Sequence, residues 1–298
     1  MGRSISLPQI ILLCVFVSPT LALSSESQPT PGDSLIVVSL TDGTSLRGTI
    51  ILEDTSAVTI MTITGLEIEV PRSVIANIEP LSGRVIAGVY YRSDPNTSRL
   101  LFAPTGRPLL KGEGYLTDYW VLFPGVAYGV TNNFTILAGV SVIPGLGISE
   151  QIKYIAPRVG FRASPNTWLS AGVLFVSFFG EFSAGIAFAV ATHGAIDKSF
   201  TYGLGLGFSK SGQGETKFAD YPILLLGGST RLSNSLALVS ENWIFLSDNF
   251  ELSNQPLSLA LRFFGDRIAV DLGGIITLGT FQGGFPIPWL SFVYNFRR

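Results

Sequence analysis

Residues Ser199–Ser209, SFTYGLGLGFS, carry the clearest structural pattern in the chain. In a β-strand, alternate side chains point to opposite faces. One face of this stretch is bulky and apolar, with Phe200, Tyr202, Leu204, Leu206 and Phe208. The opposite face is small and uncharged, with Thr201, Gly203, Gly205 and Gly207. Such a pattern predicts a membrane strand whose bulky side chains face lipid and whose small ones face a closed interior.

The composition of the whole chain agrees with this prediction. Only 13% of the residues are charged, against about 25% in soluble domains, and the mean hydropathy is +0.44. Yet no internal run reaches the roughly 18 uncharged apolar residues that a membrane helix needs. High apolarity without helical spans is typical of a β-barrel, because strand alternation dilutes the signal. The net charge of −2 gives no support to a nucleic-acid partner.

The N-terminus has the features of an export signal, which we place at residues 1–23. Arg3 supplies a positive charge, Ile10–Val17 an apolar core, and Thr20–Ala22 a small-residue cleavage site, with a second choice two residues later. A retained membrane anchor is the alternative, and the shortness of the core argues against it. Cys14 lies in this core and is the only cysteine. Cleavage would leave a mature chain with no disulfide and no thiol nucleophile.

A polar leader (24–33) precedes a small β-module (34–81). The module's expected strands are Leu35–Leu40, Ser45–Leu52, Ala57–Thr62, Leu66–Val70 and Val74–Ile78. Five short strands with Gly43, Gly48 and Gly65 at turns and bends resemble Sm-like and SH3-like barrels, a resemblance limited to this stretch. Such folds host unrelated functions. From Asp33 to Leu81 two basic residues stand against seven acidic ones, a balance that repels RNA and leaves a periplasmic protein or the cell wall as candidate partners.

After a linker (82–97) with a further strand expected at Val85–Tyr91, residues 98–298 predict a barrel of about twelve antiparallel strands. The length of most segments matches the ~9–11 residues with which a tilted strand crosses a bilayer, or exceeds it. The expected strands are Ser98–Pro104, Gly114–Gly129, Asn133–Ile143, Glu150–Ala163, Thr167–Phe179, Phe182–His193, Ser199–Lys210, Ala219–Leu232, Ser235–Ser247, Pro256–Phe264, Ile268–Thr280 and Pro286–Phe296. The predicted fold class is therefore all-β, a transmembrane barrel preceded by a small five-stranded barrel.

The links between these strands alternate in length. Short polar links are expected at Thr131–Asn132, Ser164–Asn166, Gly194–Lys198, Ser233–Asn234 and Gly265–Arg267. Longer ones are expected at Thr105–Glu113, Pro144–Ser149, Ser211–Phe218, Asp248–Gln255 and Phe281–Phe285, with the tight Gly180–Glu181 turn as the exception. Bacterial outer-membrane barrels have short periplasmic turns and longer external loops. The alternation predicts that both chain ends and the small module lie in the periplasm.

The last expected strand is similar to the aromatic-ended closing strand of bacterial outer-membrane barrels. Its apolar face is formed by Leu290, Phe292, Tyr294 and Phe296. The trailing Arg297–Arg298 departs from that pattern. The resemblance implies an outer-membrane location and no particular solute.

Five charges lie inside expected wall strands: Arg158, Arg162, Glu241, Arg262 and Asp271. A charge on the lipid face costs about 2–4 kcal/mol at mid-depth, so these side chains should point into the lumen. Two interpretations stay open. They line a pore that selects solutes, or they form a buried ion-pair network that plugs the barrel.

His193 is the only histidine, and it is the one candidate for catalysis. A serine–histidine site for lipid hydrolysis needs a serine within hydrogen-bond reach and an orienting partner, and Gly194-Ala195 follow instead. With no mature cysteine, a zinc site would depend on carboxylates. The sequence therefore predicts no enzyme, no metal and no cofactor.

Most aromatic residues of the expected barrel lie near strand ends, as interfacial girdles do. They are Tyr115, Tyr119, Trp120, Trp168, Trp243, Trp289 and Tyr294.

Three functions follow from these patterns. The first is a channel or transporter for small or apolar solutes, and the second is a non-catalytic interaction barrel whose acidic module binds a periplasmic partner. A lipid-acting outer-membrane enzyme is the third.

Overall fold

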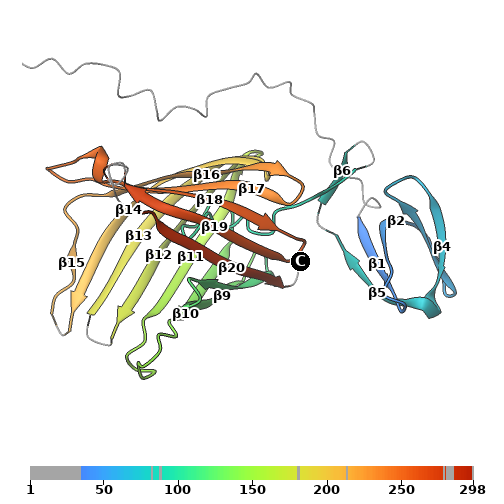
Figure 1. Cartoon of the computed structure of the whole chain (residues 1–298), viewed down its shortest axis with the longest axis horizontal. Helices are drawn as coiled ribbons and strands as arrows, with labels where there is room; N and C mark the ends of the chain where they lie inside the picture. Colours follow the sequence, from blue (N-terminus) through green and yellow to red (C-terminus); the bar gives the residue numbers. More distant parts are fainter. Residues whose placement is uncertain are drawn as a thin grey trace, which may run out of the picture.

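The computed structural model describes residues 35–81, 83–86, 89–179, 182–212, 214–277, 279 and 285–296. The expected export signal, the leader, the Gly180–Glu181 turn and Arg297–Arg298 lie outside these residues. Within them the chain forms an antiparallel barrel and a separate antiparallel sheet, linked by a short hairpin (Figure 1). No helix of the described part is long and apolar enough to span a membrane.

The small module contains the five strands that the sequence predicts. They are β1 (Ile36–Leu40), β2 (Ser45–Glu53), β3 (Ala57–Thr62), β4 (Glu67–Pro71) and β5 (Ile75–Pro80), with a 3₁₀ turn at Arg72–Val74. Their order in the sheet is β4-β3-β2-β1-β5. Alternate residues of these strands supply the core, with Ile36, Val38, Val58, Ile60 and Val70 buried.

In the described residues the barrel wall has twelve antiparallel strands, which confirms the predicted fold class. They are β8 (Gly114–Tyr119), β9 (Phe123–Gly129), β10 (Phe134–Val140), β11 (Lys153–Ser164), β12 (Thr167–Phe178), β13 (Phe182–Gly194), β14 (Lys198–Ser211), β16 (Ile223–Ser233), β17 (Leu236–Phe245), β18 (Pro256–Phe264), β19 (Ile268–Thr277) and β20 (Ile287–Phe296). Strand β20 pairs with β8 and closes the wall. The two-residue β15 (Lys217–Phe218) pairs with the end of β14, and a 3₁₀ turn lies at Leu252–Asn254.

Two predicted strands are wrong, and the errors cancel in the strand number. The predicted strand Ser98–Pro104 is not in the wall; it contains only an isolated bridge between Arg99 and Pro104. The predicted strand Gly114–Gly129 is a hairpin, because the chain turns back between β8 and β9. At this turn Trp120 and Val121 have φ of 53° and 63°. Bulky residues seldom adopt such angles, so the sequence carries no turn signal there.

Five short turns lie at one end of the barrel, which we call the proximal end. They span residues 130–133, 165–166, 195–197, 234–235 and 265–267. The first residue of β8 pairs with the last of β20 at this same end. The described link between β10 and β11 (141–152) is longer and lies at the opposite, distal end. The five expected short links therefore lie at one end. Two links depart from the expected alternation: the turn between β8 and β9 (120–122) is short and distal, and Thr105–Glu113 lies proximally, where Arg107 donates to the carbonyl of Gly194.

The small module is tied to the proximal end through the hairpin of β6 (Gly83–Ile86) and β7 (Val89–Arg92). Arg92 Nε lies 2.8 Å from the Asp266 carboxylate, and the backbone N–H of Arg92 donates to Asn234 at 2.8 Å. The Tyr90 hydroxyl donates to Asp266 at 3.3 Å. Burial, together with the Asp266 charge, raises the pKa of Tyr90 to about 12, so the phenol stays a donor at neutral pH.

Strand β14 has the orientation that its sequence predicts. Phe200, Tyr202 and Leu204 are about half exposed on the outside, whereas Thr201 is fully buried. Strand β13 is reversed: its bulky residues Ile186, Phe188 and Val190 point into the lumen, and Ala187 and Ala189 point out. The orientation predicted for Ser199–Ser209, with bulky side chains outward, therefore does not extend to β13.

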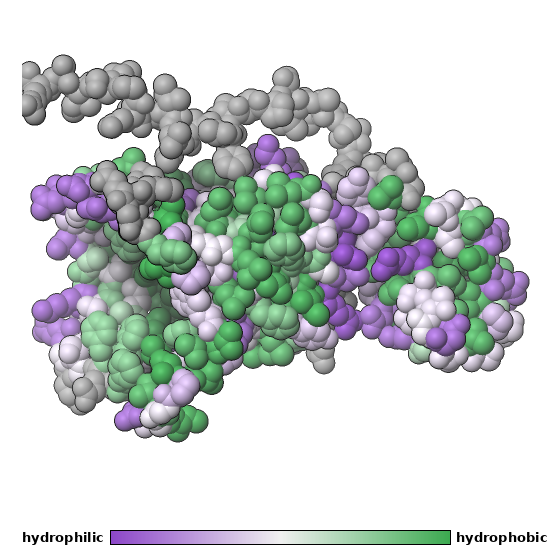
Figure 2. All heavy atoms as spheres, in the orientation of Figure 1, coloured by the Kyte–Doolittle hydropathy of each residue, from purple (hydrophilic) through white to green (hydrophobic). Residues whose placement is uncertain are grey.

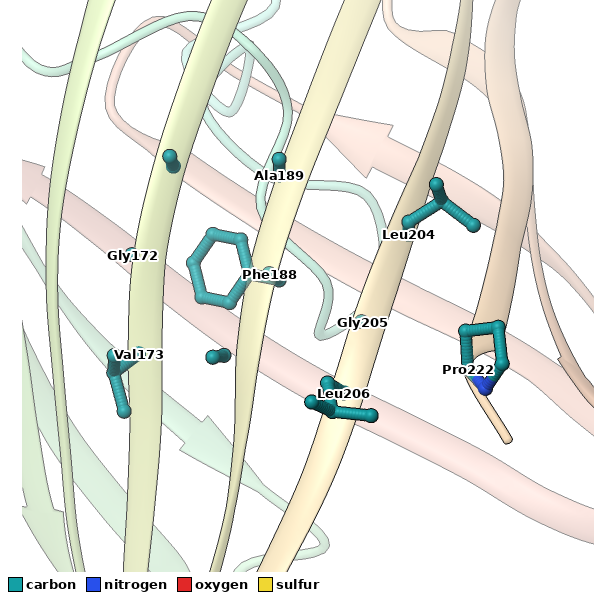
Figure 3. A pocket seen from close by; sticks show the side chains of 10 residues that line it. Gly172, Val173, Phe188, Ala189, Leu204, Gly205, Leu206 and Pro222 are labelled. Carbon is teal, nitrogen blue, oxygen red and sulfur yellow. The ribbon is translucent and has the colours of Figure 1, made fainter. Parts of the chain in front are cut away.

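The reversal of β13 follows from the glycines of its neighbours. Phe188 lies between Gly172 of β12 and Gly205 of β14 (Figure 3). A Cβ at Gly205 would lie 2.6 Å from Ile186 Cγ2, closer than van der Waals contact allows. Side chains of β13 therefore cover the glycine face of β14, which the sequence alone left as open space.

Most of the barrel's outer surface is apolar, and Figure 2 shows hydrophobic residues over its flank and hydrophilic ones toward its ends. The exposed apolar side chains include Leu116, Val126, Val159, Phe161, Val173, Phe175, Phe200, Tyr202, Leu204, Leu206, Leu259, Leu261, Phe263, Leu272 and Phe292. The outward alanines of β13 form the floor of a shallow groove of about 700 Å³ between the bulkier side chains of the neighbouring strands (Figure 3).

The aromatic girdle expected from the sequence is only partly present. Tyr115, Tyr119 and Trp289 are buried within the barrel, and Trp243 lines the lumen. Trp120 is exposed at the distal turn and packs edge-on against Trp289. Aromatic residues near strand ends here fill the interior more often than they mark a rim.

Two glycines of β14 provide a matched test of this packing. Gly205→Ala should destabilise the barrel by about 1–3 kcal/mol, because the new methyl overlaps Ile186. Gly207→Ala should change the stability by less than about 0.5 kcal/mol, because its Cβ would meet Ala219 at an ordinary 3.5 Å. Denaturant unfolding in detergent, followed by tryptophan fluorescence, measures both. Equal stability of the two variants would contradict the inward packing of β13.

Candidate functional site

The lumen is occupied by a stretch of irregular backbone, residues 94–109, which we call the lumen segment. It follows the β6–β7 hairpin and precedes β8. Inward side chains of strands on all sides contact it. The Thr192 hydroxyl of β13 accepts a hydrogen bond from the backbone N–H of Gly106 at 2.8 Å, and the Thr135 hydroxyl of β10 accepts one from the backbone N–H of Leu109 at 3.0 Å. The side-chain amide of Asn295, on β20, donates to that of Asn96 at 3.3 Å. The segment is therefore a plug near the proximal end.

Glu241, on β17, holds the middle of the segment. One carboxylate oxygen accepts the consecutive backbone N–H groups of Leu101, Phe102 and Ala103 at 2.9, 2.8 and 2.8 Å. The other oxygen accepts the indole N–H of Trp243 at 2.8 Å. Glu241 is 4% exposed, and hydrogen bonds to an ionised acceptor in such an interior are among the stronger ones.

Arg262 and Asp271 form a second anchor, from β18 and β19. Arg262 Nε lies 2.6 Å from one Asp271 oxygen and Nη2 lies 3.1 Å from the other, a bidentate pair. Both side chains are almost fully buried. Arg262 also donates to the carbonyl of Leu100 at 2.5 Å, and Arg99 of the segment lies 3.1 Å from Asp271. The wall pair thus binds the segment's backbone and its charge together.

Arg158, on β11, binds the segment without an acidic partner. Its guanidinium donates to the backbone carbonyls of Thr105, Ser98 and Arg107 at 2.8, 3.0 and 3.3 Å. No described acidic side chain lies within ion-pair distance of it. Among the described buried residues, four arginines stand against three acids: Asp94, Arg99, Arg107, Arg158, Glu241, Arg262 and Asp271. This end of the lumen therefore has a positive excess.

Arg162 is placed apart from the other four predicted charges. It shares the inward face with Arg158, yet it lies beyond the rim, exposed, where it donates to the carbonyls of Ser164 and Pro165. Its guanidinium lies 5.7 Å from the ring of Trp168. The structure therefore brings Arg158, Glu241, Arg262 and Asp271 together on the lumen segment and leaves Arg162 at a turn.

His193 is exposed at the proximal rim, where Nδ1 lies 3.0 Å from the Thr167 hydroxyl. This is the position that the sequence predicts, beside a short turn. The described residues contain no group of three or more His, Cys, Asp and Glu side chains that could hold a metal ion.

Distal to the segment the character of the lumen changes from charged to apolar. A hollow there is lined by Phe102 of the segment and by Leu174, Ile186, Phe188 and Trp243 of the wall. These side chains are only partly buried, so they border unfilled space. Beyond them the inward positions of the described wall strands carry no acidic or basic side chain. The barrel is thus a cup with apolar walls and a polar floor.

The prediction from the sequence did not include the residues that the lumen segment itself contributes to the site. Asp94, Asn96 and Arg99 are buried among the wall charges. Charges in the wall strands indicated that polar groups must face them. The apolar run Leu100–Ala103 has the composition of a strand, so the sequence did not identify this segment as the partner of the wall charges. The excess of inward arginines over acids was the available signal.

No family model matches the chain, and neither a curated protein nor a solved structure matches it.

Two arginines provide a matched test of the plug. Arg262→Gln should destabilise the barrel by about 3–5 kcal/mol, because it leaves the buried Asp271 with half of its cationic partners. Arg162→Gln should cost less than about 0.5 kcal/mol, because that side chain is exposed. The measurement is denaturant unfolding in detergent. A loss for Arg162→Gln as large as for Arg262→Gln would refute this account of the charges.

Proposed function

We propose that the protein is an outer-membrane β-barrel that takes up apolar solutes through a plugged lumen, with the small module and both chain ends in the periplasm. The observation that carries the proposal is the apolar, partly exposed inner wall above a polar floor. A water-filled pore for polar solutes would instead have polar side chains along its length. A wall without acidic or basic side chains beyond the floor favours solutes whose larger part is apolar.

The outer surface supports the membrane part of this proposal. Its exposed apolar side chains extend around the wall, and the described outward charges lie toward strand ends, at Asp118, Lys153, Lys198 and Lys210. A closed barrel leaves no unpaired strand edge, which a lipid environment requires. The short turns at the proximal end match the periplasmic turns of outer-membrane barrels.

The membrane assignment predicts that the full-length protein, expressed in a diderm bacterial host, fractionates with the outer membrane. It should also migrate faster on a gel before heating than after, because the folded barrel resists the detergent. Recovery in the soluble periplasmic fraction, without a heat-dependent shift, would overturn the assignment.

Transport through this lumen requires the segment to yield, and Glu241 is the residue to test. Glu241→Gln removes the charge that holds three backbone N–H groups. In planar bilayers the wild type should be almost non-conducting, and Glu241→Gln should open more often. Ser240→Ala, a change of the neighbouring outward residue, serves as the control. In cells, uptake of the hydrophobic probe N-phenylnaphthylamine should exceed that of a vector control and rise further with Glu241→Gln.

The second candidate is an interaction barrel, in which the plug stays closed and the acidic module binds the cell wall. Glu67 and Glu69 are exposed on β4, at the edge of the module's sheet. This candidate predicts no gain in probe uptake, together with co-sedimentation with peptidoglycan that Glu67→Lys/Glu69→Lys alters. Probe uptake without any effect of the charge reversal would support the transporter instead.

A further inference from the structure

We infer that the hollow above the plug binds one long-chain carboxylate, with its head group at Arg158 and Ser98 and its chain along the apolar wall. This inference rests on the proposed function and names the class of solute. The polar residues at the floor of the hollow indicate the head group of such a ligand, and the apolar residues of its wall indicate the chain.

The floor favours an anion. Arg158 and Arg99 both line the hollow, and Arg158 is 6% exposed with three neutral carbonyls as its described hydrogen-bond partners. A buried cation without a counter-ion is costly, and a carboxylate relieves that cost. The excess of buried arginines over acids means that one anion would balance this end of the lumen.

A second polar group faces the same space. Ser98 is 2% exposed and lines the hollow, and its hydroxyl has no hydrogen-bond partner among the described residues. Buried polar groups are nearly always paired, so an unpaired one beside an open space indicates a missing partner. A carboxylate oxygen between Ser98 and Arg158 would accept from both.

The wall favours an unbranched apolar chain. The hollow measures about 40 Å³, which leaves room for a small head group. Leu137, Leu174, Ile186, Phe188 and Trp243 line it. Beyond the hollow the inward positions of the described wall strands carry no acidic or basic side chain, so the chain of the ligand would lie along an apolar wall.

Trp243 provides a direct reporter, because it is one of only four tryptophans and lines the hollow. The test uses the full-length protein in non-ionic detergent with the other three tryptophans changed to Phe. 9,10-dibromostearate should quench Trp243 saturably, and stearate should displace it. Methyl stearate, which lacks the anionic head, should compete at least tenfold more weakly. A variant that keeps only Trp120, which is exposed at the distal turn, gives the quenching due to detergent partitioning.

Two pairs of variants keep the result independent of stability. Ala156→Leu fills the hollow and should weaken binding at least tenfold, whereas Ala187→Leu, on the outer surface, should leave it unchanged. Ser98→Ala should reduce the preference for stearate over its methyl ester, with Ser164→Ala at the rim as its control.

The outcomes separate this inference from the proposed function. Quenching of Trp243 no greater than that of Trp120, or equal competition by the methyl ester, would overturn the carboxylate site. Saturable carboxylate binding without probe uptake in cells would leave the site standing and refute transport. Probe uptake without binding would do the reverse.

Discussion

The structure depends on one requirement, that the irregular backbone inside the barrel must find hydrogen-bond partners there. Unpaired N–H and C=O groups in a dry interior cost several kcal/mol each by transfer estimates, about 1–3 kcal/mol in proteins. Glu241 meets this requirement for Leu101–Ala103, Arg262 for Leu100, and Arg158 for three further carbonyls. The wall charges are therefore explained by the segment, and the segment is held in place by the wall charges.

This arrangement also explains the division of the lumen. The buried charges of the described residues gather where the segment lies, because they have partners there. Distal to that level the described inward wall positions carry no charge, and Leu174, Ile186 and Phe188 point inward. The small module is joined to the N-terminal end of the same segment through the β6–β7 hairpin, which contacts Asp266 and Asn234.

Much of this could be predicted from the sequence, for reasons that also mark its limits. Alternation located nearly every wall strand, and the cost of charge in lipid placed Arg158, Glu241, Arg262 and Asp271 inward. The reversal of β13 could not be predicted, since alanine and phenylalanine suit either side when the outer surface and the lumen are both apolar. The lumen segment was hidden because Leu100–Ala103 has the composition of a strand, and no local pattern distinguishes a wall strand from a chain packed inside the wall.

Hydrogen exchange at the amides of Leu101, Phe102 and Ala103 tests the central claim most directly, in the full-length protein in detergent. If Glu241 holds these three N–H groups inside a closed barrel, they should exchange as slowly as the amides of β17 and β18, and Glu241→Gln should speed their exchange selectively. Exchange as fast as that of the exposed residues 214–217, unaffected by Glu241→Gln, would contradict the plugged barrel.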